Sequence, residues 1–183
     1  MTEKVPDWFK AYAVGREEIW EKDPHFRAFA ATLHELTNET DRGVALVVSS
    51  CLDKILGDSL SAFLLENNSA QALLAGFNAP LGTLSTKIAA CHALGLISDA
   101  EWRDCQILRR VRNAFAHEIT VTFESDSVRD LCGNLHLPVE DKENTRGKFA
   151  KASMLLLINM LNRPFHVAQR RLTCLEWNSK PAA

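Results

Sequence analysis

The chain has 183 residues, a formal net charge of −2 and a hydrophobic share of 46%, values that fit one globular domain with a core of useful size. The longest apolar run in its middle, Val44 to Val48, is far too short to span a bilayer, so we expect no membrane segment. The charge balance gives no overall attraction to nucleic acid, and any such binding would have to come from local basic patches.

The cysteines and the start of the chain indicate a cytoplasmic protein. The first residues carry mixed charge and no leucine-rich block, unlike a secretion signal. Five cysteines are an odd number, and no two of them form a C-x-x-C pair. This pattern argues against a disulfide framework and against a zinc cluster. We therefore expect buried thiols, with no structural metal and no cofactor.

Helical periodicity covers most of the chain. N-terminal helices are predicted within residues 6–38, where aromatic residues recur at helical spacing. Over residues 41–65 the apolar positions continue at the same period with few polar interruptions, so this helix should be central. A short helical turn is predicted at residues 70–75.

Local signals mark the ends of the next helices. Gly95 stands where a C-cap is expected for a helix over residues 81–94. Ser98 and Glu101 then form a capping-box pattern, which predicts that the following helix begins there. Residues 119–123 alternate between apolar and polar, which indicates a short extended piece.

The remaining elements complete an all-α prediction. Ser127 and Asp130 offer a second capping box, residues 138–144 read as a loop, and one long helix is predicted over residues 145–175 with a kink at Pro164. Such elements predict a single all-helical, bundle-like domain over residues 1–183.

An arginine interrupts the apolar face of the helix that follows Ser98. Four apolar residues share one arc of its helical wheel: Cys105, Leu108, Val111 and Phe115. Arg112 falls inside that arc. Because a guanidinium stays charged, it must be offset by carbonyls, a bound anion or a carboxylate such as Asp53 or Glu118, or else it must reach a cleft.

The polar residues around Arg112 suggest a composite site. Arg112 and His117 are five residues apart, so an unbroken helix points them about 140° away from each other. They meet if the helix ends near His117, if the arginine curls around, or if a second copy of the chain supplies one of them. Asn113 and His117 share a helix face with Arg109. We therefore predict a homodimer or a larger assembly.

Three motifs together resemble the mannitol operon repressor (MltR-like) family. They are P-L-G at residues 80–82, G-L-I at residues 95–97 and R-N-A-F-A-H at residues 112–117, and the resemblance covers residues 41–135. It implies a bacterial, all-helical, self-associating protein that regulates transcription of a sugar or polyol operon. Because the sequence offers no helix with exposed base-reading side chains, we expect it to act through a protein partner and not by direct DNA binding.

Residues 112–117 are also similar to the R-x4-H motif of HEPN domains, helical dimers among which many are metal-independent endoribonucleases. That resemblance implies a HEPN-like core in which Arg112 would steady the scissile phosphate of RNA, His117 would act as general acid or base, and Asn113 would orient them. Arg109 and Arg110 would add a basic patch for binding. The alternative function is therefore a ribonuclease, whereas in the leading hypothesis the same residues form a structural or ligand-sensing centre of a regulator.

Overall fold

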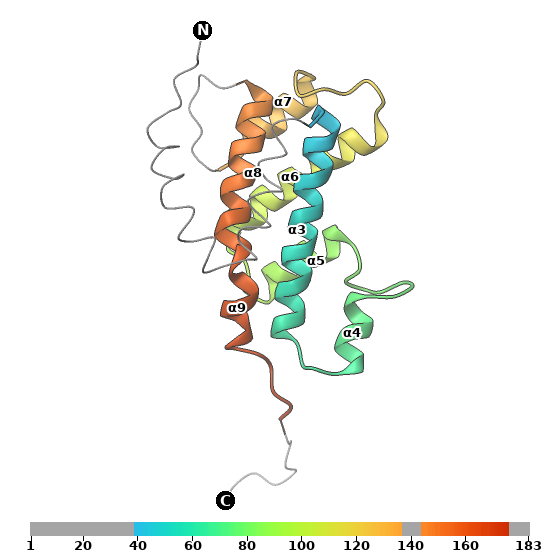
Figure 1. Cartoon of the computed structure of the whole chain (residues 1–183), viewed down its shortest axis with the longest axis vertical. Coiled ribbons are helices and arrows are strands. Elements are labelled where there is room, and N and C mark those ends of the chain that lie inside the picture. Colours follow the sequence, from blue (N-terminus) through green and yellow to red (C-terminus); the bar gives the residue numbers. More distant parts are fainter. Residues whose placement is uncertain (1–38, 137–143, 176–183) are drawn as a thin grey trace, which may run out of the picture. The chain divides into compact units, whose positions relative to one another are not determined.

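The computed structural model describes residues 39–136 and 144–175 (Figure 1). These residues form helices α3 to α9 and contain no strand, which confirms the all-α prediction. The helices belong to one compact unit that begins at Thr40. The helices predicted within residues 6–38 and most of the predicted loop at residues 138–144 lie outside the described residues. None of the described helices combines the length and apolar character needed to cross a bilayer.

Helix α3, Asp41–Phe63, is the central element, as its periodicity predicted. The Thr40 side chain caps it by accepting a hydrogen bond of 3.0 Å from the backbone N–H of Gly43. Its fully buried apolar residues recur at helical spacing: Val44, Val48, Leu52, Leu56 and Leu60. This face packs against α5, α6, α8 and α9. The helix thus lies at the centre of the packing among the described helices.

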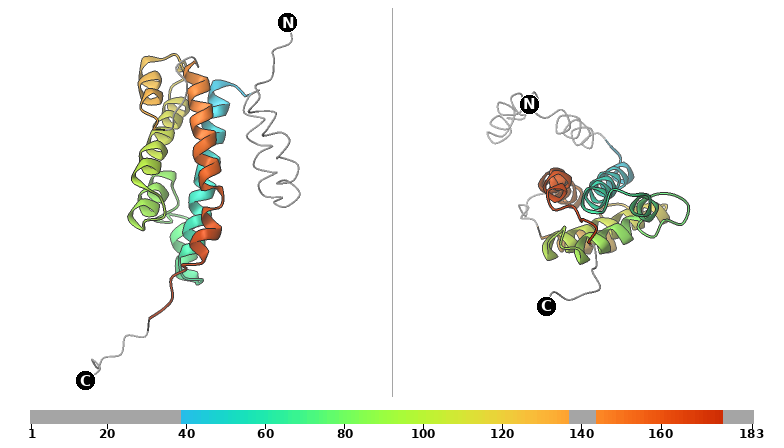
Figure 2. Two further views of the ribbon diagram at one scale, coloured as in Figure 1. Left: turned by 90° about the vertical axis from the view of Figure 1, so that its left-hand side faces the viewer. Right: turned by 90° about the horizontal axis from the view of Figure 1, so that it is seen from below.

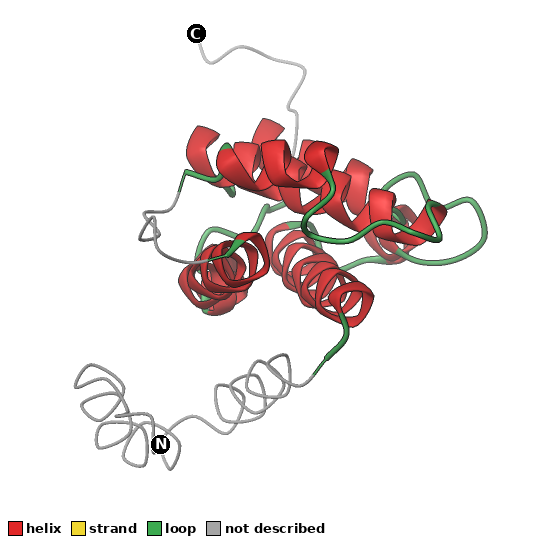
Figure 3. Cartoon of the chain, turned by 90° about the horizontal axis from the view of Figure 1, so that it is seen from above, coloured by secondary structure: helices red, strands yellow, loops and turns green. Residues whose placement is uncertain are grey.

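The helices are arranged in two layers. In one layer α3 lies beside α8, Thr145–Leu161, and α9, Arg163–Ala168. The other layer contains α5, Leu84–Ala93, α6, Asp99–His117, and α7, Asp126–Gly133. Figures 2 and 3 show this second layer crossing the first obliquely. Short helix α4, Asn68–Leu74, connects α3 to the second layer.

Three phenylalanines join the layers near the end of α6. The ring of Phe123 lies 4.9 Å from that of Phe115 and 5.1 Å from that of Phe149, measured between centroids, and all three side chains are buried. Tilted aromatic pairs at this separation stabilise a core beyond their buried area alone. Phe123 belongs to the segment predicted to be extended, residues 119–123. That segment is a loop: its alternation places Val121 and Phe123 in the core without any strand pairing.

The predicted helix starts are confirmed at one position and shifted at others. Ser98 and Glu101 form the expected capping box of α6, with a hydrogen bond of 2.8 Å from the Ser98 backbone N–H to the carboxylate. Helix α5 begins at Leu84 and not at residue 81, because Thr83 and Thr86 cap each other.

The second predicted capping box, at Ser127, is wrong. Helix α7 begins at Asp126, so Ser127 lies inside its first turn. Ser125 stands at the N-cap, and its hydroxyl accepts a hydrogen bond of 3.1 Å from the backbone N–H of Thr122, in the preceding loop.

The long C-terminal helix predicted over residues 145–175 is broken. Helix α8 ends at Leu161, α9 covers Arg163–Ala168, and residues 171–175 are not helical. Pro164 lies in the first turn of α9, where its missing N–H is tolerated, whereas inside a continuous helix it would clash with the preceding turn. The segment after α9 returns to α3, with a hydrogen bond of 2.8 Å from the Leu172 N–H to the carbonyl oxygen of Phe63.

Candidate functional site

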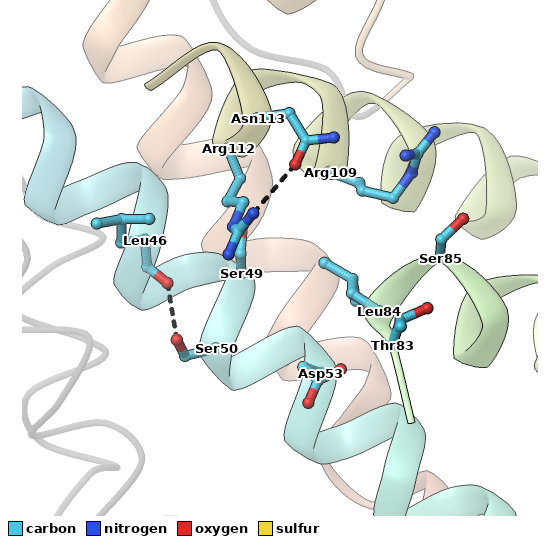
Figure 4. Close-up of a pocket in the computed structure, with 10 residues that line it drawn as sticks. All are labelled: Leu46, Ser49, Ser50, Asp53, Thr83, Leu84, Ser85, Arg109, Arg112 and Asn113. Carbon is cyan, nitrogen blue, oxygen red and sulfur yellow. Dashed lines mark hydrogen bonds between the residues drawn. The ribbon is translucent and has the colours of Figure 1, made fainter. Parts of the chain in front are cut away.

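A cleft of about 550 Å³ opens between α3, α5 and α6. Its walls carry part of the polar set that the sequence predicted, together with residues that it did not. Figure 4 shows the lining residues: Leu46, Ser49, Ser50 and Asp53 from α3, Thr83, Leu84 and Ser85 from the start of α5, and Arg109, Arg112 and Asn113 from α6. Eight of these ten side chains are polar or charged, so the cleft is suited to a polar ligand.

Arg112 sits at the edge of the core arc of α6 and reaches this cleft. Val111 and Phe115 beside it are fully buried, whereas Arg112 is half-buried. Its Nη1 donates a hydrogen bond of 3.2 Å to Oδ1 of Asn113. Among the described residues it has no carboxylate partner. The sequence allowed either a buried ion pair or a guanidinium that reaches a cleft. In the structure the guanidinium of Arg112 reaches the cleft.

The carboxylate expected for that pair is engaged elsewhere. Asp53 Oδ2 lies 2.7 Å from Nζ of Lys87, an ion pair that joins α3 to α5. Only 12% of the Lys87 side chain is exposed, so the ammonium is held close to the carboxylate. The negative charge of Asp53 on the cleft wall is therefore compensated by Lys87.

The neighbouring arginines of α6 have different surroundings. Arg109 lines the cleft and donates from Nε to Oε1 of Gln106 over 3.1 Å. Figure 4 shows its side chain running along α6 toward Ser85. Arg110 is exposed and is not part of the lining. One of the two predicted binding arginines therefore belongs to the cleft.

His117 lies apart from the cleft. It is the last residue of α6, is exposed and does not line the cavity. The end of α6 is held by Arg42 of α3, whose guanidinium donates to the backbone carbonyl oxygens of Phe115, Glu118 and Ile119. Within one chain the cleft thus contains Arg112 and Asn113 but not His117.

Two serines of α3 were not singled out from the sequence. Ser49 is only 4% exposed, and its Oγ has no hydrogen-bond partner among the described residues. Ser50 donates to the carbonyl oxygen of Leu46 over 2.9 Å. Ser49 and Ser50 interrupt the apolar run of a central helix, which is an unusual pattern. This interruption was the sequence feature from which the two serines could have been identified.

The cysteines do not contribute reactive groups to the site. Burial raises the pKa of Cys91 and of Cys132 to about 12 and also raises the pKa of Cys105, so these thiols stay protonated at neutral pH. Cys51 is half-buried and Cys174 exposed. In the described part of the chain no three His, Cys, Asp or Glu side chains gather as metal ligands.

Comparison with known proteins gives one informative likeness. No protein-family model matches the chain, and no curated protein matches its sequence. Its structure is similar to a chain in the X-ray structure of the MtlR-HPr complex from Escherichia coli, with a TM-score of 0.59 and 18% sequence identity over 72% of this chain and 96% of that chain. At this identity the likeness concerns the fold. The helical architecture described above is therefore shared with a component of the MtlR-HPr complex.

Proposed function

We propose that this protein is a regulator of transcription that acts by binding another protein, in the manner expected of the mannitol operon repressor-like family. The observation that carries the proposal is the fold shared with a chain of the MtlR-HPr complex. The motifs at residues 80–82, 95–97 and 112–117 support it. Its target is a sugar or polyol operon, its partner is an HPr-like protein, and it works in the bacterial cytoplasm.

The distribution of charge supports an indirect role at DNA. The net charge is −2, and two of the four arginines on α6, Arg109 and Arg112, line a cleft and do not project from a helix face. A helix that reads bases presents several side chains outward into the major groove. The other two, Arg103 and Arg110, are exposed, and a pair of outward arginines is fewer than the series of side chains that a recognition helix presents.

Exposed apolar side chains near α9 offer a surface for the partner. Phe165, Leu172 and Leu175 are exposed although each is strongly hydrophobic. Aromatic and aliphatic anchors of this kind supply much of the free energy of protein association. We assign the partner contact to this segment, which follows α8 at the lower end of the unit in Figure 1.

Isothermal titration calorimetry of the full chain with HPr from the same organism tests the proposal. We expect a saturable complex that Phe165→Ser weakens by roughly tenfold or more, since buried aromatic anchors contribute about 2 kcal/mol or more. Phe77→Ser is the matched control, because Phe77 is almost fully exposed on the loop between α4 and α5. Absence of a complex, combined with selective binding of the protein alone to its promoter DNA, would contradict the proposal.

A metal-independent endoribonuclease is the second candidate function. The observation that favours it is a cleft that holds Arg112 and Asn113 side by side. Because His117 does not line this cleft, the reaction would need a second copy of the chain to bring a His117 to it, so this function requires the predicted homodimer.

Sedimentation velocity and metal-free RNA cleavage test the second candidate. A dimer that cleaves RNA, and whose His117→Ala variant folds but loses roughly 10²–10⁴-fold in rate, would support it. A monomer without cleavage would reject it. His136→Ala is a suitable control, since its side chain is remote from residues 112–117 in sequence and outside the cleft lining.

A further inference from the structure

We propose that the cleft between α3, α5 and α6 binds the phosphate group of a small polyhydroxylated molecule, a sugar phosphate in chemical class. The site is an effector site on this chain. It goes beyond the proposed function, because it concerns neither the HPr-like partner nor the surface near α9. The phosphate site and the proposed binding of an HPr-like partner can therefore be disproved separately.

Arg112 supplies the principal anion-binding group. A guanidinium has five N–H donors in a fixed fork, and within residues 39–136 and 144–175 the guanidinium of Arg112 makes one hydrogen bond, to Asn113 at 3.2 Å. The half-buried position limits how well water can solvate it. A phosphate oxygen pair matches the fork, and hydrogen bonds between such ionised groups are stronger than neutral ones.

Ser49 is an independent indication of a ligand. It is 4% exposed, it lines the cleft, and its Oγ has no partner among the described residues. A buried hydroxyl without a hydrogen bond costs free energy, so such groups call for a partner. In Figure 4 its side chain rises from α3 in the direction of the Arg112 guanidinium. The same cleft thus holds a guanidinium with free donors and a hydroxyl that has no partner among the described residues.

The start of α5 adds positive potential to the same cleft. Thr83 caps this helix, and Leu84 and Ser85 form its first turn on the cleft wall. The first backbone N–H groups of a helix have no acceptor within the helix, and the helix dipole makes this end favourable for anions. Arg109 runs toward Ser85 (Figure 4). Positive groups thus come from two elements, α5 and α6.

The size and the remaining lining indicate what the phosphate is attached to. A volume of about 550 Å³ is far larger than one phosphate needs and is typical of a small-molecule site. The carboxylate of Asp53 and the hydroxyls of Ser50 and Thr83 suit the hydroxyl groups of a ligand body. Two arginines, Arg109 and Arg112, belong to the lining, a number of cationic groups that suits one phosphate better than an RNA backbone.

Calorimetric titration of the full chain at constant ionic strength and neutral pH tests the site. The probes are glucose 6-phosphate, glucose, inorganic phosphate and a short oligoribonucleotide. We expect saturable binding of glucose 6-phosphate, weaker binding of inorganic phosphate and none of glucose. The same glucose 6-phosphate concentration should raise the melting temperature of the protein, because a ligand that binds the folded state stabilises it.

Four variants separate the cleft from general electrostatics. Arg112→Ala should weaken glucose 6-phosphate binding roughly 10- to 100-fold, and Arg112→Lys, which keeps the charge but loses the fork, should lie between it and wild type. Ser49→Ala should weaken binding without lowering the melting temperature, since it removes an unsatisfied hydroxyl. Arg110→Ala has the same charge change on the same helix outside the cleft, and it should leave the affinity unchanged.

Three results would overturn the proposal. The first is the absence of saturable binding of glucose 6-phosphate. The second is an equal loss of affinity in Arg110→Ala and Arg112→Ala, which would mean unspecific attraction. The third is an affinity for inorganic phosphate or for the oligoribonucleotide that equals or exceeds the affinity for glucose 6-phosphate.

Discussion

Arg42 and Glu118 are joined by a hydrogen bond of 2.8 Å from the guanidinium Nη2 to the backbone carbonyl oxygen. The same side chain donates to the carbonyl oxygens of Phe115 and Ile119. The last carbonyls of a helix have no partner within it. The first turn of α3 therefore caps the end of α6, on which His117 lies.

Replacement of this cap should destabilise the fold. Arg42→Ala would leave these carbonyl oxygens without their donor, and we expect a loss of about 1–3 kcal/mol in the free energy of unfolding. For a chain of this length that is a fall of roughly 2–12 °C in melting temperature. Arg42→Lys, whose ammonium can donate to only some of these carbonyl oxygens, should lose less stability. Equal melting temperatures of wild type and Arg42→Ala would show that the cap is not stabilising.

The pair formed by Glu101 and Arg163 predicts a pH dependence. Nη2 of Arg163 lies 2.6 Å from Oε1 of Glu101. Burial opposes ionisation of Glu101, but the hydrogen bonds from Arg163 and Ser98 outweigh it and hold the pKa of the carboxyl below its ordinary value of about 4.5. A lowered folded-state pKa stabilises the fold above the unfolded-state pKa, and this stabilisation is lost as the pH falls through the folded-state pKa.

Urea denaturation at a series of pH values measures this effect. The wild-type free energy of unfolding should decrease as the pH falls below about 4.5. Glu101→Gln should be less stable than wild type at neutral pH and should show a shallower decrease in acid. Glu124→Gln, at an exposed position in the loop before α7, serves as the control. A Glu101→Gln variant with the wild-type profile would exclude the ion pair as a source of stability.

Arg112→Ala should cost little stability in the absence of ligand. Among the described residues the guanidinium has no carboxylate partner, so the substitution leaves no buried charge behind. We expect a change of about 1 kcal/mol or less, as for most positions outside the core. Denaturant titration of the ligand-free protein measures it. A loss of about 3–5 kcal/mol would instead indicate a buried ion pair.

The five thiols should react with a thiol reagent at very different rates. Cys174 is exposed and should react first, and Cys51 should follow. Cys91, Cys105 and Cys132 are buried, with pKa values raised by burial, and should react only after unfolding. Cys174→Ser should remove the fastest phase at neutral pH. Fast reaction of Cys91 in the native protein would contradict the described core.

The helices of this protein were predictable because their signals are local. The apolar arc of Leu108, Val111 and Phe115 has helical period, and Ser98 with Glu101 forms a recognisable cap, so α6 could be placed well. The start of α5 was missed because a Thr83–Thr86 pair is a less usual capping box. The break between α8 and α9 depends on Pro164, whose presence predicted a kink and not a full interruption.

The site was predictable in its residues but not in its pairings. Arg112 and Asn113 were identified from their place on the helix. The partner of Asp53 is Lys87, 34 residues further along the chain, and the cap of α6 comes from Arg42. Such pairings depend on how helices pack against one another, and periodicity within one helix contains no information about that packing. The role of Ser49 in the cleft depends on such packing too, since the other walls of the cleft come from α5 and α6.

The return of the chain to the end of α3 has a consequence for biosynthesis. Arg171 donates to the carbonyl oxygen of Leu64, 107 positions earlier. At bacterial or eukaryotic translation speeds of about 5–20 residues per second, α3 emerges from the ribosome roughly 5–20 s before the segment that closes over its end. During that interval part of its apolar face has no native partner. The nascent chain is therefore a natural client for a chaperone that shields a hydrophobic helix until synthesis of the last helices is complete.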